Sequence, residues 1–97
     1  MNLFVDDHRP MPKTGYQYCQ DVEGATFLLS LMTFEVISLD YDLGEGRTGM
    51  EILEYMYAHN VKVSRINIHS DNVLGIEQMK EYCAEHFPDV ELTFRRA

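Results

Sequence analysis

The chain has 97 residues, of which 45% are hydrophobic and 25% are charged, so disorder and fibrous folds are excluded and residues 1–97 are taken as one domain. Its formal net charge is −8 and its basic residues are scattered, which argues against binding of duplex nucleic acid. The longest apolar runs are too short to cross a membrane.

The first predicted element is a short buried strand, Leu3–Val5, which ends at Asp6 and Asp7. These acids stand where a secretory signal would need Lys or Arg, so we expect the protein in the cytoplasm. Residues 8–15 contain two prolines and a glycine and cannot form a regular helix. Tyr16–Gln20 alternates apolar and polar residues, which is typical of an edge strand.

Helices and strands alternate through the middle of the chain. Asp21 is a candidate N-cap for a helix whose apolar residues repeat at helical spacing as far as Met32. Val36–Asp40 is a second strand that ends in an acid. After a glycine-rich turn, Thr48 and Glu51 have the spacing of a capping box at the start of the next helix.

The last third of the chain repeats this alternation. Arg65–Ser70 is a strand with polar groups at its end. Asp71 or Asn72 caps the following helix, which Pro88 stops, and Val90–Phe94 closes the chain as an alternating strand. The order β-β-α-β-α-β-α-β predicts an α/β domain with a mainly parallel sheet joined by right-handed crossovers.

The pattern lacks the helices that usually follow the first and last strands of a five-stranded parallel sheet. The strands agree with this loss because they alternate: Ile37 and Leu39 flank Ser38, and Ile66 and Ile68 flank a polar residue. Parallel sheets are ordinarily covered on both faces. We therefore expect three helices on one face and a more polar second face, either wet or covered by a second copy in a homodimer.

Polar groups follow three of the predicted strands. Asp6 and Asp7 follow the first, Asp40 ends the next strand that finishes in an acid, and His69 and Ser70 end the strand after that. Ligands of open α/β sheets bind beyond the carboxyl ends of the strands. Crowded carboxylates repel one another unless a cation compensates, and Mg²⁺, Mn²⁺ or Ca²⁺ suits such oxygen ligands. The alternative is that these acids serve turns and caps.

Three stretches of the sequence resemble, in order, the motifs of the cyclic-phosphate-processing receiver domains, a group within the receiver superfamily. They are DDHRPMP at residues 6–12, SLDYDLGEG at residues 38–46 and INIHSDNVLG at residues 66–75. The resemblance implies a small flavodoxin-like, receiver-type sheet in the strand order 2-1-3-4-5. It also implies the processing of cyclic phosphate esters in nucleotides or at RNA ends, with Mg²⁺ or Mn²⁺ as cofactor.

The acids and His69 are the predicted metal-binding and catalytic groups. Asp6, Asp7 and Asp40 would hold the metal ion, and Asp40 could instead attack phosphorus. Asp42 is a further ligand, a base or a turn residue. His69 would protonate a leaving 2′- or 3′-oxygen, because imidazole exchanges protons near neutral pH, although a single histidine at a strand end is often structural.

Three further residues are predicted to bind phosphate. The planar guanidinium of Arg9 could clamp two phosphate oxygens, with a surface salt bridge as the alternative. Ser70 and Asn72 could hydrogen-bond to phosphate oxygens, or could cap a helix.

Three hypotheses for function follow. The leading one is a metal-dependent phosphoesterase that acts on cyclic phosphates. The second is a phosphoaccepting signalling receiver, although the fifth-strand Lys usual in receivers has no match in residues 92–97. The third is a non-catalytic module that binds a metal or a nucleotide.

Overall fold

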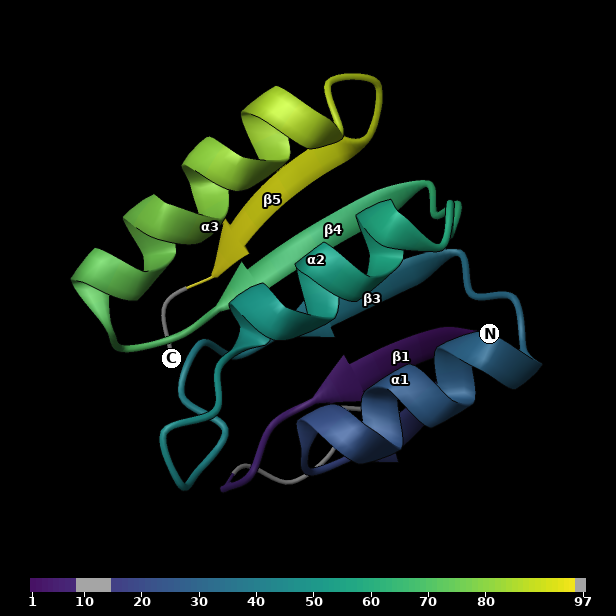
Figure 1. The fold of residues 1–97 in the computed structure, drawn as a ribbon, viewed down its shortest axis with the longest axis horizontal. Coiled ribbons are helices and arrows are strands. Elements are labelled where there is room, and N and C mark those ends of the chain that lie inside the picture. Colours follow the sequence, from purple (N-terminus) through teal and green to yellow (C-terminus); the bar gives the residue numbers. More distant parts are fainter. Residues whose placement is uncertain (9–14, 96–97) are drawn as a thin grey trace.

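The structure, a computed structural model, describes residues 1–8 and 15–95. Its strands are β1 (Asn2–Val5), β2 (Tyr16–Cys19), β3 (Val36–Leu39), β4 (Arg65–His69) and β5 (Glu91–Arg95). Its helices are α1 (Val22–Leu31), α2 (Gly49–Ala58) and α3 (Val73–His86). The elements follow the predicted order along the chain (Figure 1).

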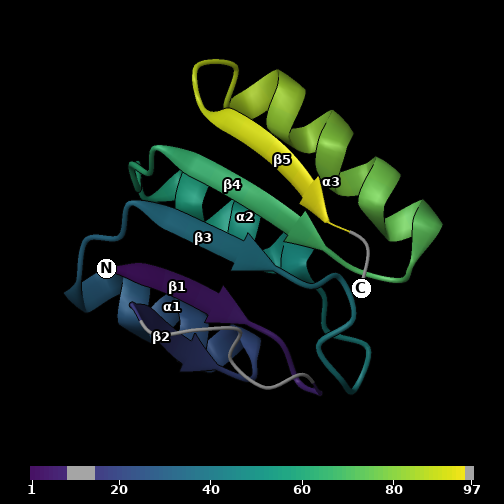
Figure 2. The same ribbon diagram turned by 180° about the vertical axis from the view of Figure 1, so that it is seen from behind.

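All five strands are parallel and form one sheet in the order β2-β1-β3-β4-β5, as predicted. From behind, the arrows of the sheet all run in one direction, with β3 in the middle, between β1 and β4 (Figure 2). The position of β1 between β2 and β3 is important because its carboxyl end lies beside that of β3, the strand that leads into Asp40. The pairing therefore brings together residues that lie far apart in the sequence.

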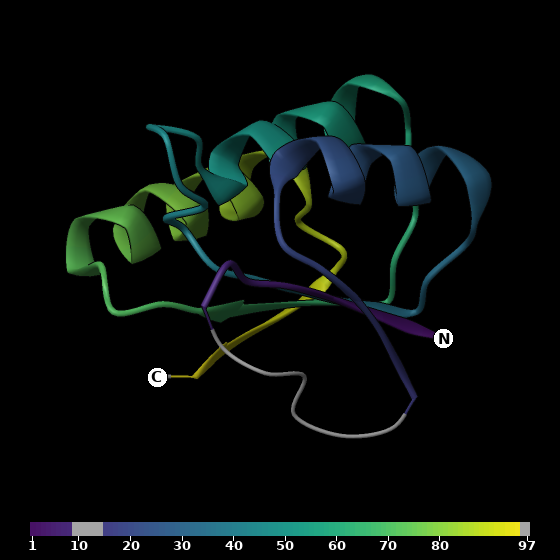
Figure 3. The ribbon, with the colours of Figure 1, turned by 90° about the horizontal axis from the view of Figure 1, so that it is seen from below.

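The three helices lie together on one face of the sheet (Figure 3). Within residues 1–8 and 15–95, no helix follows β1 or β5, which agrees with the predicted two-layer arrangement. None of the helices in this part of the chain is long and apolar enough to cross a membrane.

Side-chain caps explain where the helices begin. Asp21 Oδ1 accepts a hydrogen bond from the Gly24 amide at 2.7 Å, and Asn72 Oδ1 accepts one from the Gly75 amide at 2.9 Å. The predicted capping box of α2 is present, and its Glu51 carboxylate accepts from the Thr48 amide. A cap of this kind contributes about 1 kcal/mol. Asn72, rather than Asp71, is therefore the cap of α3.

The core lies between the helices and one face of the sheet. Every second strand residue faces it, so Leu3, Val5, Ile37, Leu39 and Ile68 are at most 1% exposed. Burial of an aliphatic side chain of this size contributes roughly 1.5–3 kcal/mol. Helical residues such as Ile52, Leu53 and Met56 complete the core.

The opposite face of the sheet is more polar, as predicted, but its centre is buried. Phe4, Ser38 and His69 are 7%, 4% and 4% exposed within the single chain. Phe4 also packs against Tyr16 and Tyr18 of the edge strand, with ring centroids 6.1 Å apart in each pair. The homodimer through this face stays a prediction.

Candidate functional site

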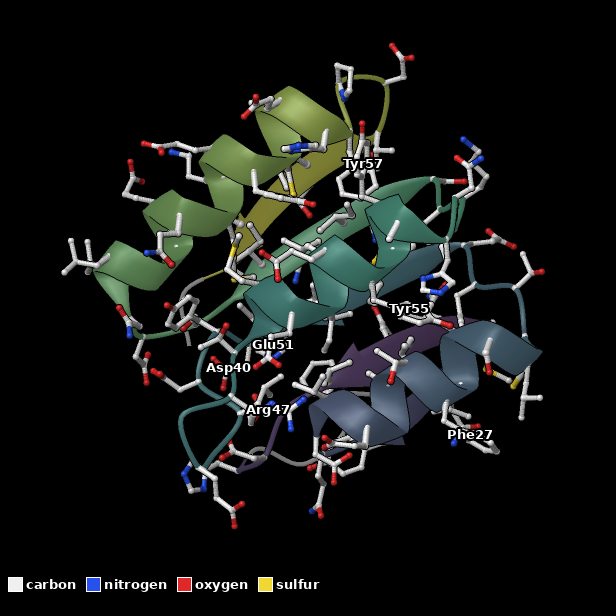
Figure 4. All side chains as sticks on the ribbon, in the orientation of Figure 1. Phe27, Asp40, Arg47, Glu51, Tyr55 and Tyr57 are labelled. Atoms are coloured by element: carbon white, nitrogen blue, oxygen red, sulfur yellow. The ribbon has the colours of Figure 1, made fainter. Side chains whose placement is uncertain are left out.

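A cavity of about 220 Å³ opens at the carboxyl ends of β1, β3 and β4. It is lined by Asp6, Asp7, His8, Asp40, Asp42, Ser70 and Asp71. All four predicted metal ligands therefore line one cavity, at the sheet edge where the sequence placed them. Figure 4 shows Asp40 beside the loop that connects β3 to α2.

Backbone pairing continues past the strands and holds the acids together. The Asp40 amide donates to the Val5 carbonyl at 3.1 Å, and the Asp6 amide donates to the Cys19 carbonyl at 3.1 Å. As a result, one carboxylate oxygen from each of Asp6, Asp7 and Asp40 lies within 4.8 Å of the other two. Asp6 is fully buried and Asp40 is 8% exposed, so this negative charge is poorly screened by water.

The hydrogen bonding of the acids fits a hard cation. Asp7 Oδ1 is buried and has no hydrogen-bond partner among the described residues. A buried carboxylate oxygen without a donor is costly unless a cation takes the donor's place. A site whose ligands are all carboxylate oxygens suits Mg²⁺, Mn²⁺ or Ca²⁺ rather than softer metals. The residues present therefore fit the predicted metal ion.

Asp42 lies at the cavity but outside the group of three acids. It is exposed, and its Oδ2 accepts a hydrogen bond from Asn72 Nδ2 at 3.2 Å. Asn72 caps α3 with its other side-chain atom and is not among the residues that line the cavity. Ligation by Asp42 and phosphate binding by Asn72 stay predictions.

Ser70 lines the cavity and is 1% exposed. Its Oγ accepts a hydrogen bond from the Asn72 amide at 3.1 Å, so it also shapes the entry into α3. Ser70 therefore shares the cavity with the acids. Its role in phosphate binding stays a prediction.

His69 is buried behind the acids rather than in the cavity wall. Its Nε2 lies 3.0 Å from Asp6 Oδ2, and its Nδ1 lies 2.7 Å from Ser38 Oγ. The ring of Phe4 stacks on the imidazole at a centroid distance of 4.4 Å, with 3° between the planes. Asp6 thus contacts the imidazole and also lines the cavity, whereas His69 does not line it. Its predicted role as proton donor is untested.

Arg9, the predicted phosphate clamp, lies outside the described residues. Among the described residues near the acids, Arg47 carries a positive charge. Its guanidinium donates to the carboxylate of Glu51, which lies beside it in Figure 4, and also to that of Glu23. The hydrogen bond from Arg47 lowers the pKa of the Glu23 carboxyl below its ordinary value. Arg47 therefore links α1 to α2, and its guanidinium is paired with these two carboxylates rather than with the acids of the cavity.

Sequence reasoning missed two residues of the cavity wall, His8 and Asp71. The sequence signal was available, because each directly follows a predicted site residue. The His8 amide donates to Asp6 Oδ1 at 2.8 Å, which helps to orient that carboxylate. The Tyr18 hydroxyl donates to the Asp6 carbonyl at 2.9 Å from the edge strand. This contact between strands had no local sequence signal.

The loop before α2 runs beside the acids. Gly44 has a φ of 81°, which glycine adopts without strain. A side-chain carbon at this position would lie 3.5 Å from Asp7 Oδ2. The glycine therefore lets the loop turn close to the acid cluster.

The chain is similar to a known protein family over most of its length. The family model for the cyclic-phosphate processing receiver domain matches residues 1–85. No curated protein and no solved structure matches the chain.

Proposed function

The chain belongs to the cyclic-phosphate processing receiver domain family, and from this membership we propose that it is a metal-dependent phosphoesterase that opens cyclic phosphate esters. The observation that carries the proposal is the cluster of Asp6, Asp7 and Asp40, with a buried Asp7 oxygen that lacks a donor. Such a cluster supports cation binding at the sheet edge where ligands of this fold class bind.

The reaction adds one water to the ester. An oxygen of water or of Asp40 bonds to phosphorus, the bond from phosphorus to the 2′- or 3′-oxygen breaks, and that oxygen takes up a proton. If Asp40 attacks, water then cleaves the aspartyl-phosphate. A bound Mg²⁺ or Mn²⁺ would polarise a phosphoryl oxygen and neutralise the developing negative charge.

The residues of the chain have separate tasks in this proposal. Asp6, Asp7 and Asp40 hold the cation, and Asp42 at the cavity edge is a candidate for a further ligand or a base. Ser70 is the candidate hydrogen-bond donor to the phosphoryl group, with Arg9 and Asn72 as further candidates. The sequence predicts His69 as the source of the proton, but its described contact with the cavity runs through Asp6, so the proposal takes this proton from water in the cavity.

The test is turnover of 2′,3′-cyclic nucleotides and of RNA with a cyclic phosphate end, with and without Mg²⁺ or Mn²⁺. We expect metal-dependent turnover that Asp40→Asn lowers by at least about 100-fold, because the variant loses a ligand charge. Asp89→Asn is the matched control, since this exposed acid lies before β5 and outside the cavity. Equal rates for Asp40→Asn and wild type would refute the proposal.

The same preparation separates the two alternatives. Stable labelling of Asp40 by a small phosphodonor, without turnover of cyclic esters, would favour a signalling receiver. Metal-dependent melting without product would favour a binding module. We further propose that the substrate is a small phosphoester or an RNA end, that the protein is cytoplasmic and that it forms a homodimer. Sedimentation of the purified chain tests the dimer directly.

A further inference from the structure

A row of polar side chains crosses the sheet on the face without described helices. Ser38 of β3, Asn67 of β4 and Thr93 of β5 lie opposite one another in the strand register. Thr93 Oγ1 lies 2.8 Å from Asn67 Oδ1, and Asn67 Nδ2 lies 2.9 Å from Ser38 Oγ. We call these three residues the sheet row. It ends at His69, whose Nδ1 lies 2.7 Å from Ser38 Oγ.

The direction of the hydrogen bonds can be followed along the sheet row. Thr93 donates its hydroxyl proton to the Asn67 carbonyl oxygen, and the Asn67 amide then donates to Ser38 Oγ. A serine hydroxyl has one proton, and here the amide already occupies an acceptor position. The Ser38 proton is therefore available for the imidazole, and Nδ1 can accept it if that nitrogen carries no proton.

The other side of the imidazole requires the same direction. Nε2 faces Asp6 Oδ2 at 3.0 Å, and an ionised carboxylate can only accept. A neutral ring must therefore carry its proton on Nε2 to make this bond, which leaves Nδ1 as the acceptor. The stacked Phe4 ring, 3° from parallel, holds the imidazole in the plane that both bonds need.

We propose that His69 is a positioning residue for Asp6, and that the sheet row fixes the His69 tautomer that carries its proton on Nε2. This inference rests on the proposed function only in taking Asp6 as a metal ligand. The Nε2–H group holds one oxygen of Asp6, while the His8 amide holds the other at 2.8 Å. The carboxylate is thus oriented before the cation arrives. Groups that orient ligands typically change metal affinity about 10–100-fold when they are removed.

Ser38→Ala tests the inference because it removes the donor to Nδ1 and leaves the strand and the ring in place. Ser38→Thr retains the hydroxyl and is the rescue variant. Ser30→Ala is the matched control, since that exposed hydroxyl on α1 bonds only to the Phe27 carbonyl among the described contacts. Thermal unfolding checks that all variants fold.

Two measurements on the full chain are needed. Nitrogen NMR of the metal-free protein, at a pH well above the ordinary imidazole pKa of about 6.5, reports which ring nitrogen carries the proton. Titration with Mn²⁺ alone, followed by the electron paramagnetic resonance of the free ion, gives the dissociation constant. We expect the Nε2–H tautomer in the wild type, a mixture of tautomers in Ser38→Ala, and Mn²⁺ binding about 10-fold weaker in that variant. Ser38→Thr and Ser30→Ala should match the wild type.

A proton on Nδ1 of His69 in the wild type would overturn the inference, whether the ring is neutral or charged. So would Ser38→Ala with unchanged tautomer and unchanged Mn²⁺ affinity, or a wild type that does not bind Mn²⁺. A wild type that binds Mn²⁺ and shows the expected tautomer, but does not turn over cyclic esters, would refute the proposed function and leave this inference standing.

Discussion

The two faces of the sheet use the same strands for different purposes. On the helix-covered face, Ile37, Leu39, Ile66 and Ile68 are at most 1% exposed and belong to the apolar core. On the opposite face, the sheet row and His69 form hydrogen bonds that end at Asp6. Residues that are neighbours in the sequence thus serve stability on one face and the site on the other.

The difference shows how a small domain can combine a core and a site. Burial of apolar area does not depend on direction, so the helix-covered face tolerates exchanges of similar volume. Hydrogen bonds do depend on direction, so each member of the sheet row needs a particular donor or acceptor. We therefore expect substitutions on the two faces to separate stability from metal binding.

Ile66→Ala should have the largest effect on stability. The side chain is 1% exposed, and its removal leaves a cavity beneath the helices, so the free energy of unfolding should fall by about 2–5 kcal/mol. Urea denaturation measures this loss. The Mn²⁺ affinity of the folded fraction should be unchanged, and a large loss of affinity would contradict the separation of the two faces.

Gly49→Ala should lower both the stability of the fold and the affinity for Mn²⁺. A Cβ atom on this first residue of α2 would lie 2.4 Å from the Asp40 carbonyl oxygen, so the backbone must shift. Overpacking of this kind costs about 1–3 kcal/mol, and here it should also weaken Mn²⁺ binding because Asp40 moves. Gly24→Ala is the comparison, since its closest contact is a side-chain oxygen of Asp21, 2.9 Å away, which can move. Equal losses of Mn²⁺ affinity in both variants would disprove this coupling.

Asn67→Ala should have the opposite effect to Ile66→Ala, with a small loss of stability and a loss of Mn²⁺ affinity. It leaves the hydroxyl of Ser38 without a donor and that of Thr93 without an acceptor. We expect the free energy of unfolding to fall by only about 1 kcal/mol, because Asn67 and Thr93 are partly buried and water can reach them. Titration with Mn²⁺ should show that this variant binds the ion more weakly than the wild type does. A variant that loses stability but keeps the wild-type affinity would count against a role of the sheet row in the site.

The smallest effect at neutral pH concerns Cys83, which faces the core from α3. Burial raises the pKa of this thiol from 9.0 to about 11. The unfolded chain therefore releases this proton at lower pH than the folded chain, so the contribution to stability is complete below pH 9.0 and is lost as the pH rises through about 11. Urea denaturation at several pH values should show that the free energy of unfolding falls less between pH 9.0 and about 11 in Cys83→Ala than in the wild type. The same slope in both proteins would assign it to other groups.

The sequence predicted the fold well because its local signals agree with one another. Alternation in the strands indicated which face each residue would take, and Asp21, Thr48 and Glu51 marked helix starts that the structure confirms. Met32 was the exception: its spacing suggested the buried side of a helix, but it is the C-cap of α1 and is 39% exposed. Spacing alone does not show where a helix ends.

The site was predictable only in part. The cluster of Asp6, Asp7 and Asp40 follows from strand ends that meet at one edge, and the structure brings these acids together. The environment of His69 did not follow, because adjacency to Ser70 suggested that both would line the cavity. Successive strand residues point to opposite faces, so His69 turns to Phe4 and Ser38 instead. Contacts between strands of this kind depend on register, which single-sequence patterns do not contain.

Asp6 and Asp40 become neighbours only when β1 pairs with β3, so a cation that they hold would bind the folded chain and not the unfolded one. At 100 times its dissociation constant, such a ligand adds about 2.7 kcal/mol to the free energy of unfolding. Without it, the mutual repulsion of the acids opposes the pairing of β1 with β3. The supply of divalent metal would then help to set the fraction of this protein that is folded.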